Sequence, residues 1–346
     1  MDINSIKVAD TGVIIVRNKI AGAIYGMALG DSMGMPSELW GREKVRKYFG
    51  KIESLLDGPK ENSVACNYKR GQFTDDTAQA LIILDSLIAN HFNVLPTDIA
   101  TRLLAWAKKE QAFEKNILGP TSKAALLSFK EGKNIESITN QSGTNGSAMR
   151  IPPVGCLFLP DEKSELIQYV AHITKVTHSS DITIAGACMI AHAVSCAMIY
   201  KDFDEILQSV YSIEQEARAL GADTINPSLV ARTKLGIEFA KRYKDQDESF
   251  LEAIYQIIGC GVTISESVPA ALAIAYYAKD VKHCSLLCAN LGGDTDTIGA
   301  MACAICGAYQ GYTALDSSWV ELINEANDVN LMEYVDALAK QRGGVM

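Results

Sequence analysis

Apolar residues recur at helical spacing along most of the chain, and short polar or glycine-bearing stretches interrupt them. Positions three and four residues apart lie on one face of a helix, so the pattern predicts helices rather than strands. Several segments have no polar face and are rich in alanine, which indicates close contact with other helices. We predict helices at 77–89, 98–109, 122–129, 182–198, 228–242, 250–258, 268–277 and 297–309.

Signals for other kinds of structure are few. One short segment, 51–55, has the pattern of a strand. No tandem repeat of fixed period and no low-complexity linker divides the chain. The pattern therefore predicts an all-α protein, with residues 1–346 in a single domain. Glycine and proline predict breaks between helices at 30–36, 119–120, 151–155 and 259–261.

Composition narrows the classes of function. The chain has 346 residues, of which 48% are hydrophobic and 21% charged, as is typical of a folded globular protein. Its net charge of −9, without a run of Lys or Arg, argues against dedicated nucleic-acid binding. No apolar stretch reaches the roughly 18 residues of a membrane span, and we expect no membrane association.

The nine cysteines indicate the compartment. Most fall in apolar runs, where a cysteine acts as a small core residue. Cys303 and Cys306 have CxxC spacing, but they lie among alanines without a second pair or a nearby histidine. We therefore expect a reduced, cytoplasmic protein, and a monomer is favoured.

Two acidic motifs each open an apolar helix. Phe73-Thr-Asp-Asp-Thr77 and Gly292-Gly-Asp-Thr-Asp-Thr297 place two carboxylates and threonine hydroxyls in a first helical turn. Capping explains one acidic residue at a helix start, but a second carboxylate beside a buried wall needs a partner. Oxygen ligands select hard cations such as Mg²⁺, Mn²⁺ or Ca²⁺. If the two helix starts face each other, their four carboxylates balance about two divalent ions.

The two acidic motifs also have other interpretations. Simple helix capping remains open for either motif alone. The aspartate-rich motif of all-helical prenyl-diphosphate enzymes needs a further Asp downstream on the same helix face. The residues after Asp76 are Thr-Ala-Gln-Ala-Leu, which does not fit that class.

Three further polar stretches carry weaker signals. Ala28–Glu38 has the pattern of a glycine-rich turn with two acidic residues, Asp31 and Glu38. The small residues at 144–149 are typical either of a backbone cradle for an anion or of a simple Asn-Gly turn. His178, before Ser-Ser-Asp, is either a residue near a helix start or a ligand-binding residue.

In order along the chain, the motifs LGDSMGMPSE, FTDDT, NGSAMR, THSSD and NLGGDTDTIGA closely resemble those of the ADP-ribosylglycohydrolases. The resemblance runs from about residue 22 to 311. More narrowly, GMPSELW, GPKEN, LGPTSK and CANLGGDTDTIGAM resemble a bacterial branch of that family. The resemblance implies a compact orthogonal helical bundle with a dinuclear Mg²⁺ or Mn²⁺ centre in a cleft.

The resemblance also implies roles for individual residues. Glu38 closes over the metals and positions substrate or water, and it shares the catalytic role with Asp76 and Asp296. The implied metal ligands are Thr74, Asp75, Asp76, Asp294, Asp296 and Thr297. The implied substrate contacts are Asp31, Gly119, Thr121, Asn145, Gly146, Ser147, Met149 and His178, with Ser122 beside them in the cleft.

The expected reaction is hydrolysis of a ribosyl glycosidic bond, with ADP-ribose or an ADP-ribosylated acceptor as partner. Some family members carry an acidic residue near 116–122, and this chain has none there, so the general acid or base stays open. The alternatives are an N-ribosyl hydrolase of a small nucleoside-like or nucleotide-like compound and a two-metal phosphohydrolase acting on a nucleotide. A non-catalytic ADP-ribose-binding protein is disfavoured, because every implied metal ligand is present.

Overall fold

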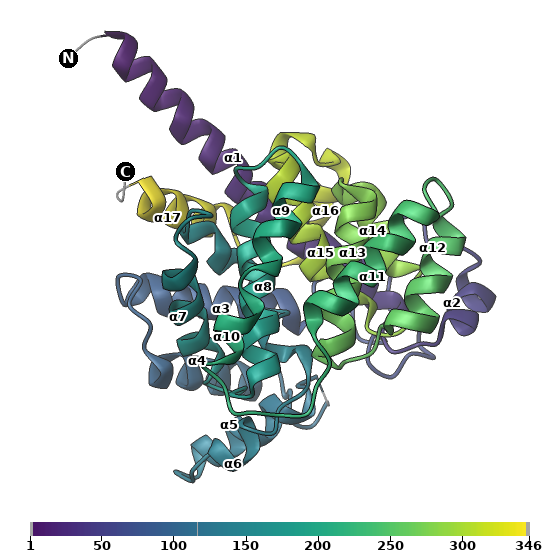
Figure 1. The fold of residues 1–346 in the computed structure, drawn as a ribbon. Helices are drawn as coiled ribbons and strands as arrows, with labels where there is room; N and C mark the ends of the chain where they lie inside the picture. Colours follow the sequence, from purple (N-terminus) through teal and green to yellow (C-terminus); the bar gives the residue numbers. More distant parts are fainter. Residues whose placement is uncertain (1–2, 116, 344–346) are drawn as a thin grey trace.

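The computed structural model of this protein describes residues 3–115 and 117–343. Helices form nearly all of its regular structure, and within those ranges the extended pairings are isolated bridges rather than strands of a sheet (Figure 1). The all-α prediction is therefore confirmed. Among the described residues, no helix is both long enough and apolar enough to cross a bilayer. The α-helices are α1 Ile3–Gly34, α2 Arg42–Phe49, α3 Asp75–Ala89, α4 Pro96–Lys109, α5 Pro120–Lys130, α6 Glu136–Thr139, α7 Lys163–Thr174, α8 Asp181–Ala197, α9 Phe203–Tyr211, α10 Glu214–Arg218, α11 Leu229–Arg242, α12 Asp247–Ala253, α13 Ile264–Ala278, α14 Val281–Ala289, α15 Thr295–Gln310, α16 Ser317–Ala326 and α17 Leu331–Gly343. Short helical turns are η1 Met35–Ser37, η2 Asn145–Ser147, η3 Pro152–Leu157, η4 Ile254–Ile258 and η5 Tyr312–Ala314.

The predicted helices all occur, with shifted ends. Polar side chains fix several of the starts: the Thr74 side chain caps α3, Ser180 caps α8 and Ser228 caps α11. The predicted helix at 250–258 is α12 followed by the π-helical turn η4. Periodicity missed the long α1, and it also missed α2, α6, α7, α9, α10, α14, α16 and α17.

Two predictions are wrong. The expected break at 30–36 begins only after Gly34, because α1 continues through Asp31 to that glycine. The expected strand at 51–55 has no strand partner. Its backbone pairs with a side chain instead: Ile52 N donates to Asn290 Oδ1 over 2.8 Å, and Asn290 Nδ2 donates to Ile52 O over 2.9 Å.

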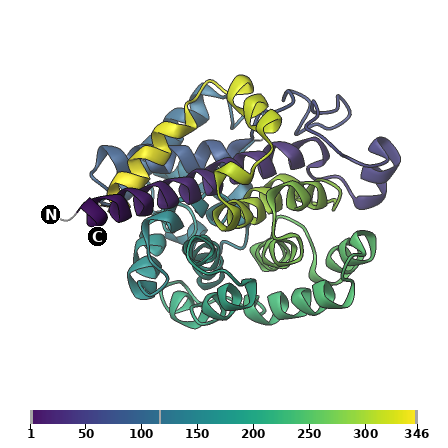
Figure 2. The same cartoon turned by 90° about the horizontal axis from the view of Figure 1, so that it is seen from above.

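The core is built around α8 and α15. Every residue of α8 is buried, and α15 is buried except at its last two residues. Figure 2, seen from above, shows α1 running between the blue and yellow helices on one side and the teal and green helices on the other. Apolar helices without a polar face therefore predicted the buried centre of the molecule correctly.

A row of glycines, which we call the glycine seam, joins α1 to α15. Its α1 members Gly22, Gly26, Gly30 and Gly34 recur every fourth residue and so share one helix face. A Cβ added at Gly30 would lie 2.1 Å from the backbone oxygen of Gly299. Similar contacts repeat at the other three positions, so the two helix backbones touch along the seam. These glycines allow close approach of two helices rather than a turn, which explains why α1 continues through Gly22, Gly26 and Gly30 to Gly34.

Candidate active site

Six acidic side chains converge where three helix ends meet: the end of α1 and the starts of α3 and α15. We call this group the acidic centre. Asp31 lies in the last turn of α1, and Glu38 follows η1. The starts of α3 and α15 provide Asp75, Asp76, Asp294 and Asp296.

A short backbone pairing brings Glu38 to the start of α15. Leu39 N donates to Gly293 O over 2.7 Å, and Gly293 N donates to Trp40 O over 2.8 Å. Gly293 has φ of +86°, and a Cβ there would lie 2.2 Å from Cys260 O, so this position requires glycine. As a result, carboxylate oxygens of Glu38, Asp294 and Asp296 lie within 4.8 Å of one another.

Threonine hydroxyls connect the two helix starts. Thr74 Oγ1 donates to Asp76 Oδ2 over 3.2 Å and lies 3.4 Å from Asp296 Oδ2. Thr297, in the first turn of α15, faces Asp76 and Asp294, and its hydroxyl opposes the rise in the pKa values of both carboxyls. The starts of α3 and α15 therefore face each other, the arrangement that a shared cation site needs.

The acidic centre concentrates negative charge in a buried place. Burial raises the pKa of Asp75 to about 7, and the charges of Asp31 and Asp294 add to this effect. Burial also places the pKa values of Asp76 and Asp296 well above their usual range, with further contributions from neighbouring carboxylates. Without a counterion, the acidic centre must therefore hold protons near neutral pH.

Two carboxylate oxygens of the acidic centre indicate whether a cation fits there. Asp76 Oδ1 and Asp296 Oδ1 are fully buried and have no hydrogen-bond partner. Leaving a buried charged oxygen without a partner is costly, so such atoms normally face a donor, a water or a metal. The surrounding donors are carboxylate and hydroxyl oxygens, which suit Mg²⁺ or Mn²⁺ better than zinc. The residues therefore fit a hard divalent cation.

Asp31 differs from the other five carboxylates because protein donors surround it. It accepts hydrogen bonds from Thr74 N at 2.9 Å, Thr77 N at 3.0 Å and Thr77 Oγ1 at 2.6 Å. Burial still raises its pKa, to about 6, while these hydrogen bonds oppose the shift. Asp31 thus fixes the first turn of α3 to α1, and it does not line the cavity next to the acidic centre.

The cavity next to the acidic centre, which we call the first cavity, has a volume of about 370 Å³. Glu38 and the carboxylates of α3 and α15 form one wall. The other wall comes from the start of α5 and from the loop around η2. Asn145 joins the two walls, because its Nδ2 donates to Asp294 Oδ2. Predicted residues that line the first cavity are Glu38, Asp75, Asp76, Gly119, Ser122, Asn145, Gly146, Met149, Asp294, Asp296 and Thr297.

Other predicted contacts lie behind this wall. Ser147 is buried and donates to Thr183 O over 3.1 Å. Thr121 accepts a hydrogen bond from Thr144 over 3.1 Å. His178 sits directly behind Gly146, where an added Cβ would lie 3.0 Å from His178 Cε1. In this structure these three residues support the lining and do not form it.

A buried chain of hydrogen bonds links the acidic centre to His178. Gln79 Nε2 donates to Asp75 Oδ2, and Arg150 Nη1 donates to Gln79 Oε1, both over 2.7 Å. Arg150 also donates to Thr177 Oγ1, which lies 2.8 Å from His178 Nδ1. Burial lowers the Arg150 pKa to about 10.

The hydrogen-bond chain fixes the state of His178. Thr144 Oγ1 donates its proton to Thr121 Oγ1, so it accepts from His178; the imidazole proton therefore sits on Nε2, and Nδ1 accepts from the Thr177 hydroxyl. That Nε2–H donates to Thr144 Oγ1 over 3.0 Å. Burial, and then the charge of Arg150, lower the His178 pKa well below its usual value, so the ring is neutral.

Sequence reasoning assigned no role to Gln79 or Arg150. Their signals were nevertheless present, because Gln79 follows Asp75 by four residues on one helix face. Arg150 ends the NGSAMR motif, and an arginine next to Ile151-Pro-Pro predicts a buried charge that needs partners. Nothing comparable in the sequence predicted that Leu39, Lys123 and Val262 would line the first cavity.

The helical fold and an acid-lined cavity between facing helix starts define the class of this protein. The ADP-ribosylglycohydrolase family profile matches residues 13–345, and the chain belongs to that family. The match confirms the resemblance and extends it beyond residues 22–311 at both ends. Members of this family are glycohydrolases.

Individual relatives span nearly the whole chain. Escherichia coli YegU, described as an uncharacterized protein, is 44% identical over 325 residues, covering 94% of this chain and 97% of YegU. Mouse ADP-ribosylhydrolase ARH3 is 26% identical, covering 87% and 86% of the two chains. The ADP-ribosyl-[dinitrogen reductase] glycohydrolase of Rhodospirillum rubrum is 21% identical, covering 95% and 98%.

A solved structure supports the fold. A chain from an ADP-ribosylglycohydrolase-related protein complex superposes with a TM-score of 0.68 at 22% identity. The match covers 95% of this chain and 98% of the other. The all-α architecture of this protein is thus that of the ADP-ribosylglycohydrolases.

Proposed function

We propose that this protein is a metal-dependent hydrolase that cleaves a ribosyl glycosidic bond and removes ADP-ribose from a modified acceptor. Hydrolysis of ADP-ribose glycosidic bonds is the reaction of its family. The observation that carries the proposal for this chain is the pair of buried carboxylate oxygens without partners, Asp76 Oδ1 and Asp296 Oδ1. They lie at two facing helix starts beside a cavity.

The proposed cofactor is a pair of divalent cations, Mg²⁺ or Mn²⁺. When bound, such ions supply Lewis acidity toward ribose hydroxyls and water. The number of carboxylates supports two ions, since one divalent cation would leave most of the negative charge unbalanced. The residues proposed to hold them are Thr74, Asp75, Asp76, Asp294, Asp296 and Thr297.

The protein's own carboxylates have two tasks in the proposed reaction. Cleavage of a glycosidic bond passes through an oxocarbenium-like state with positive charge on the sugar, which nearby carboxylates stabilise. Glu38 lines the first cavity and is only partly buried, so both substrate and water reach it. Glu38 takes the proton from the attacking water, and the water oxygen bonds to the anomeric carbon as the bond to the acceptor breaks. The acceptor atom keeps that electron pair and takes up the proton.

The loop at 145–149 is proposed to hold the diphosphate. Gly146 presents bare backbone to the first cavity, and backbone amides bind phosphate oxygens without needing a cation. Because His178 is neutral and bonded on both ring nitrogens, its role is to support Thr144 and the loop. In this proposal His178 transfers no proton.

A smaller ribosyl substrate is the second candidate. The first cavity, about 370 Å³, lies at the lower end of the roughly 300–1,000 Å³ of ligand pockets. This volume suits a nucleoside-like compound at least as well as a dinucleotide-sized one. The acidic centre would serve such a substrate, or a nucleotide phosphohydrolase reaction, with the same ligands.

The first experiment is calorimetric titration of the protein with ADP-ribose. It is done with Mg²⁺, with Mn²⁺ and in excess EDTA. We expect binding with metal and at least tenfold weaker binding in EDTA. Equal affinity in EDTA would remove the cation from the proposal. No binding under any condition would reject ADP-ribose and favour the smaller ribosyl substrate.

A further inference from the structure

Arg150 is a buried cation that the proposed reaction does not use. It directly follows the loop at 145–149 in the sequence, and it is among the largest fully buried side chains of the protein. Its hydrogen bonds run to two neutral groups, the Gln79 amide and the Thr177 hydroxyl. A buried charge with neutral partners is costly, and an apolar side chain of similar size would serve packing as well. Arg150 is therefore a candidate for a role in the site.

Arg150 sets the direction of the hydrogen bonds on both sides of it, because a guanidinium donates and cannot accept. Toward α3, its Nη1 donates to Gln79 Oε1 over 2.7 Å, so the Gln79 amide is turned with Nε2 toward Asp75 Oδ2, also at 2.7 Å. Toward the start of α8, Arg150 donates to Thr177 Oγ1, whose own proton points to His178 Nδ1 over 2.8 Å. Two directed hydrogen-bond chains therefore begin at Arg150.

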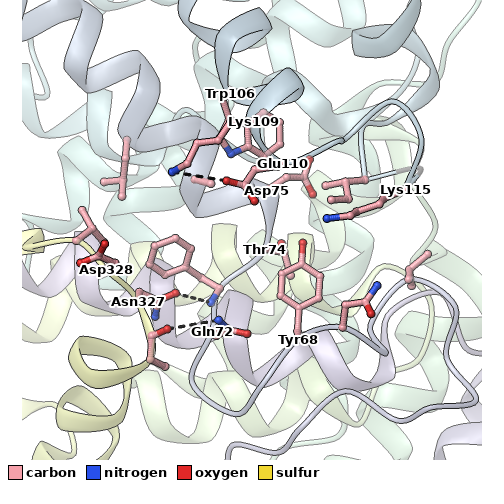
Figure 3. A pocket seen from close by; sticks show the side chains of 18 of the residues that line it. Tyr68, Gln72, Thr74, Asp75, Trp106, Lys109, Glu110, Lys115, Asn327 and Asp328 are labelled. Atoms are coloured by element: carbon pink, nitrogen blue, oxygen red, sulfur yellow. Dashed lines mark hydrogen bonds and ion pairs between the residues drawn. The ribbon is translucent and has the colours of Figure 1, made fainter.

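The first chain orients Asp75, a carboxylate that packing alone does not hold. Asp75 is only partly buried, and it lines both the first cavity and a larger cavity of about 540 Å³. Figure 3 shows the larger cavity, with Asp75 among its lining residues. Because it faces two cavities, the Asp75 carboxylate depends on the Gln79 hydrogen bond for its rotation. Such a bond to a cation ligand would preorganise the proposed cation site.

The second chain holds the loop at both of its ends. Arg150 follows the last residue of the loop, and Thr144 precedes the first. His178 Nε2 lies 3.0 Å from Thr144 Oγ1, and Thr177 connects His178 with Arg150, so the contacts close a ring behind the loop. An added Cβ at Gly146 would lie 3.0 Å from the His178 ring. The backbone that faces the first cavity is therefore supported from behind by this ring.

The loop also has an anchor that does not involve Arg150. Asn145 N donates to Val262 O over 3.0 Å, and Ile264 N donates to Gly143 O over 2.9 Å. This backbone pairing remains when a side chain behind the loop is replaced. Side-chain changes along the two hydrogen-bond chains should therefore shift the loop without unfolding it.

We propose that Arg150 is a positioning residue that fixes the two walls of the first cavity relative to each other. Through Gln79 it orients Asp75 on one wall, and through Thr177 and His178 it holds the loop on the other. This inference rests on the proposed function, in which Asp75 holds a cation and the loop holds the diphosphate. The cation and the diphosphate then keep a fixed separation, because one side chain that only donates determines the geometry of both walls.

The first test separates the two chains. Gln79→Leu and Thr177→Val each remove one link at nearly constant volume, and the probes are Mn²⁺ and ADP-ribose. In calorimetry without ADP-ribose, Mn²⁺ should bind about tenfold more weakly to Gln79→Leu and within about twofold of the unmodified protein to Thr177→Val. With saturating Mn²⁺, ADP-ribose should bind about tenfold more weakly to Thr177→Val and within about threefold to Gln79→Leu. Gln208→Leu and Thr101→Val, at exposed sites, are the matched controls and should change neither affinity.

A purely structural role would give a different result. Equal losses of both ligands in the two variants would mean a general loosening of the site, and the inference would be wrong. Unchanged Mn²⁺ binding in Gln79→Leu, or unchanged ADP-ribose binding in Thr177→Val, also overturns it. If the unmodified protein binds Mn²⁺ but not ADP-ribose, the proposed substrate has failed, and the Mn²⁺ measurements still decide whether Arg150 orients Asp75.

The second test addresses Arg150 itself. Arg150→Met removes both links and should weaken Mn²⁺ binding and ADP-ribose binding by at least about tenfold each. Arg150→Lys keeps a charge that only donates, so it should recover at least about threefold of each loss. Adding Gln79→Leu to Arg150→Met should lower the Mn²⁺ affinity by less than about twofold more, because that link is already broken. Fully additive losses, or no recovery in a folded Arg150→Lys protein, would contradict the inference. The Gln79→Leu and Thr177→Val results decide it if Arg150→Met does not fold.

Discussion

The glycine seam and the acidic centre lie on the same pair of helices and differ in almost every physical respect. Along the seam, backbones touch and no charge is present. At the acidic centre, six carboxylates crowd together, and two of their buried oxygens lack partners. The two regions meet at Gly34, where an added Cβ would lie 2.3 Å from Thr295 O.

This contrast shows how a repulsive site can be held in place. Close packing makes α1 and α15 one rigid unit, because neither helix can shift without losing contacts along the seam. The carboxylates at its end then cannot relax apart, although their mutual repulsion favours separation. The seam thus provides stability and holds the carboxylates of the acidic centre, the proposed cation site, in place.

Breaking the seam should have the largest effect. In Gly30→Ala, the new methyl group meets the backbone of α15, so the two helices must separate. We expect the free energy of unfolding to fall by more than about 4 kcal/mol, measured by urea denaturation. Gly12→Ala is the control on the same helix, because nothing lies within 4 Å of its Cβ position. It should leave stability unchanged or raise it by up to about 1 kcal/mol. Equal midpoints for the two variants would refute the importance of the seam.

Neutralising the acidic centre should separate function from stability. Asp296→Asn removes a proposed cation ligand, so we expect activity to fall by at least about 1,000-fold. Metal-free stability should not fall, and the loss of one repelling charge should raise it by about 1 kcal/mol. Kinetic assays and urea denaturation in EDTA measure the two effects, with Glu53→Gln at an exposed site as charge control. A variant that unfolds as well as losing activity would indicate a structural role for Asp296.

The smallest expected effect is the pH dependence of the metal-free protein. The pKa is about 6 for Asp31 and about 7 for Asp75, above the value of about 4 in an unfolded chain. Both groups bind protons more tightly when folded, so stability is greatest at low pH and falls as pH rises through 6 and 7. In EDTA, the free energy of unfolding should drop by about 2 kcal/mol between pH 6 and 8. Mg²⁺ should reduce this drop, and a rise in stability toward pH 8 without metal would contradict the account.

Local patterns explain what the sequence predicted correctly. Helical periodicity and capping residues act within a few positions, so α3, α8 and α15 were predictable from their own residues. The acidic motifs could also be recognised from the sequence, because they lie at the starts of two apolar helices. Their residues are Asp75, Asp76, Asp294 and Asp296. The predicted pair of cations required the starts of α3 and α15 to face each other, and they do so in the structure.

Distance along the chain explains what the sequence left out. Asp31 holds the start of α3 through Thr74, which is 43 residues away along the chain. The sequence alone did not reveal this contact, so Asp31 was predicted to bind substrate instead. The glycines at 30 and 34 read as a break, because the helix that they touch lies more than 250 residues downstream. The pairing of Leu39 with Gly293 was missed for the same reason.

The sequence by itself determined the all-α class, the central apolar helices, the family and the acidic residues that meet at the candidate active site. Only the tertiary structure decided which of those residues line the cavity and which support it from behind. The physical reason is the range of the interactions. Capping and amphipathic periodicity act within a few turns of one helix. Close packing, desolvation and charge repulsion depend on neighbours that only the folded chain brings together.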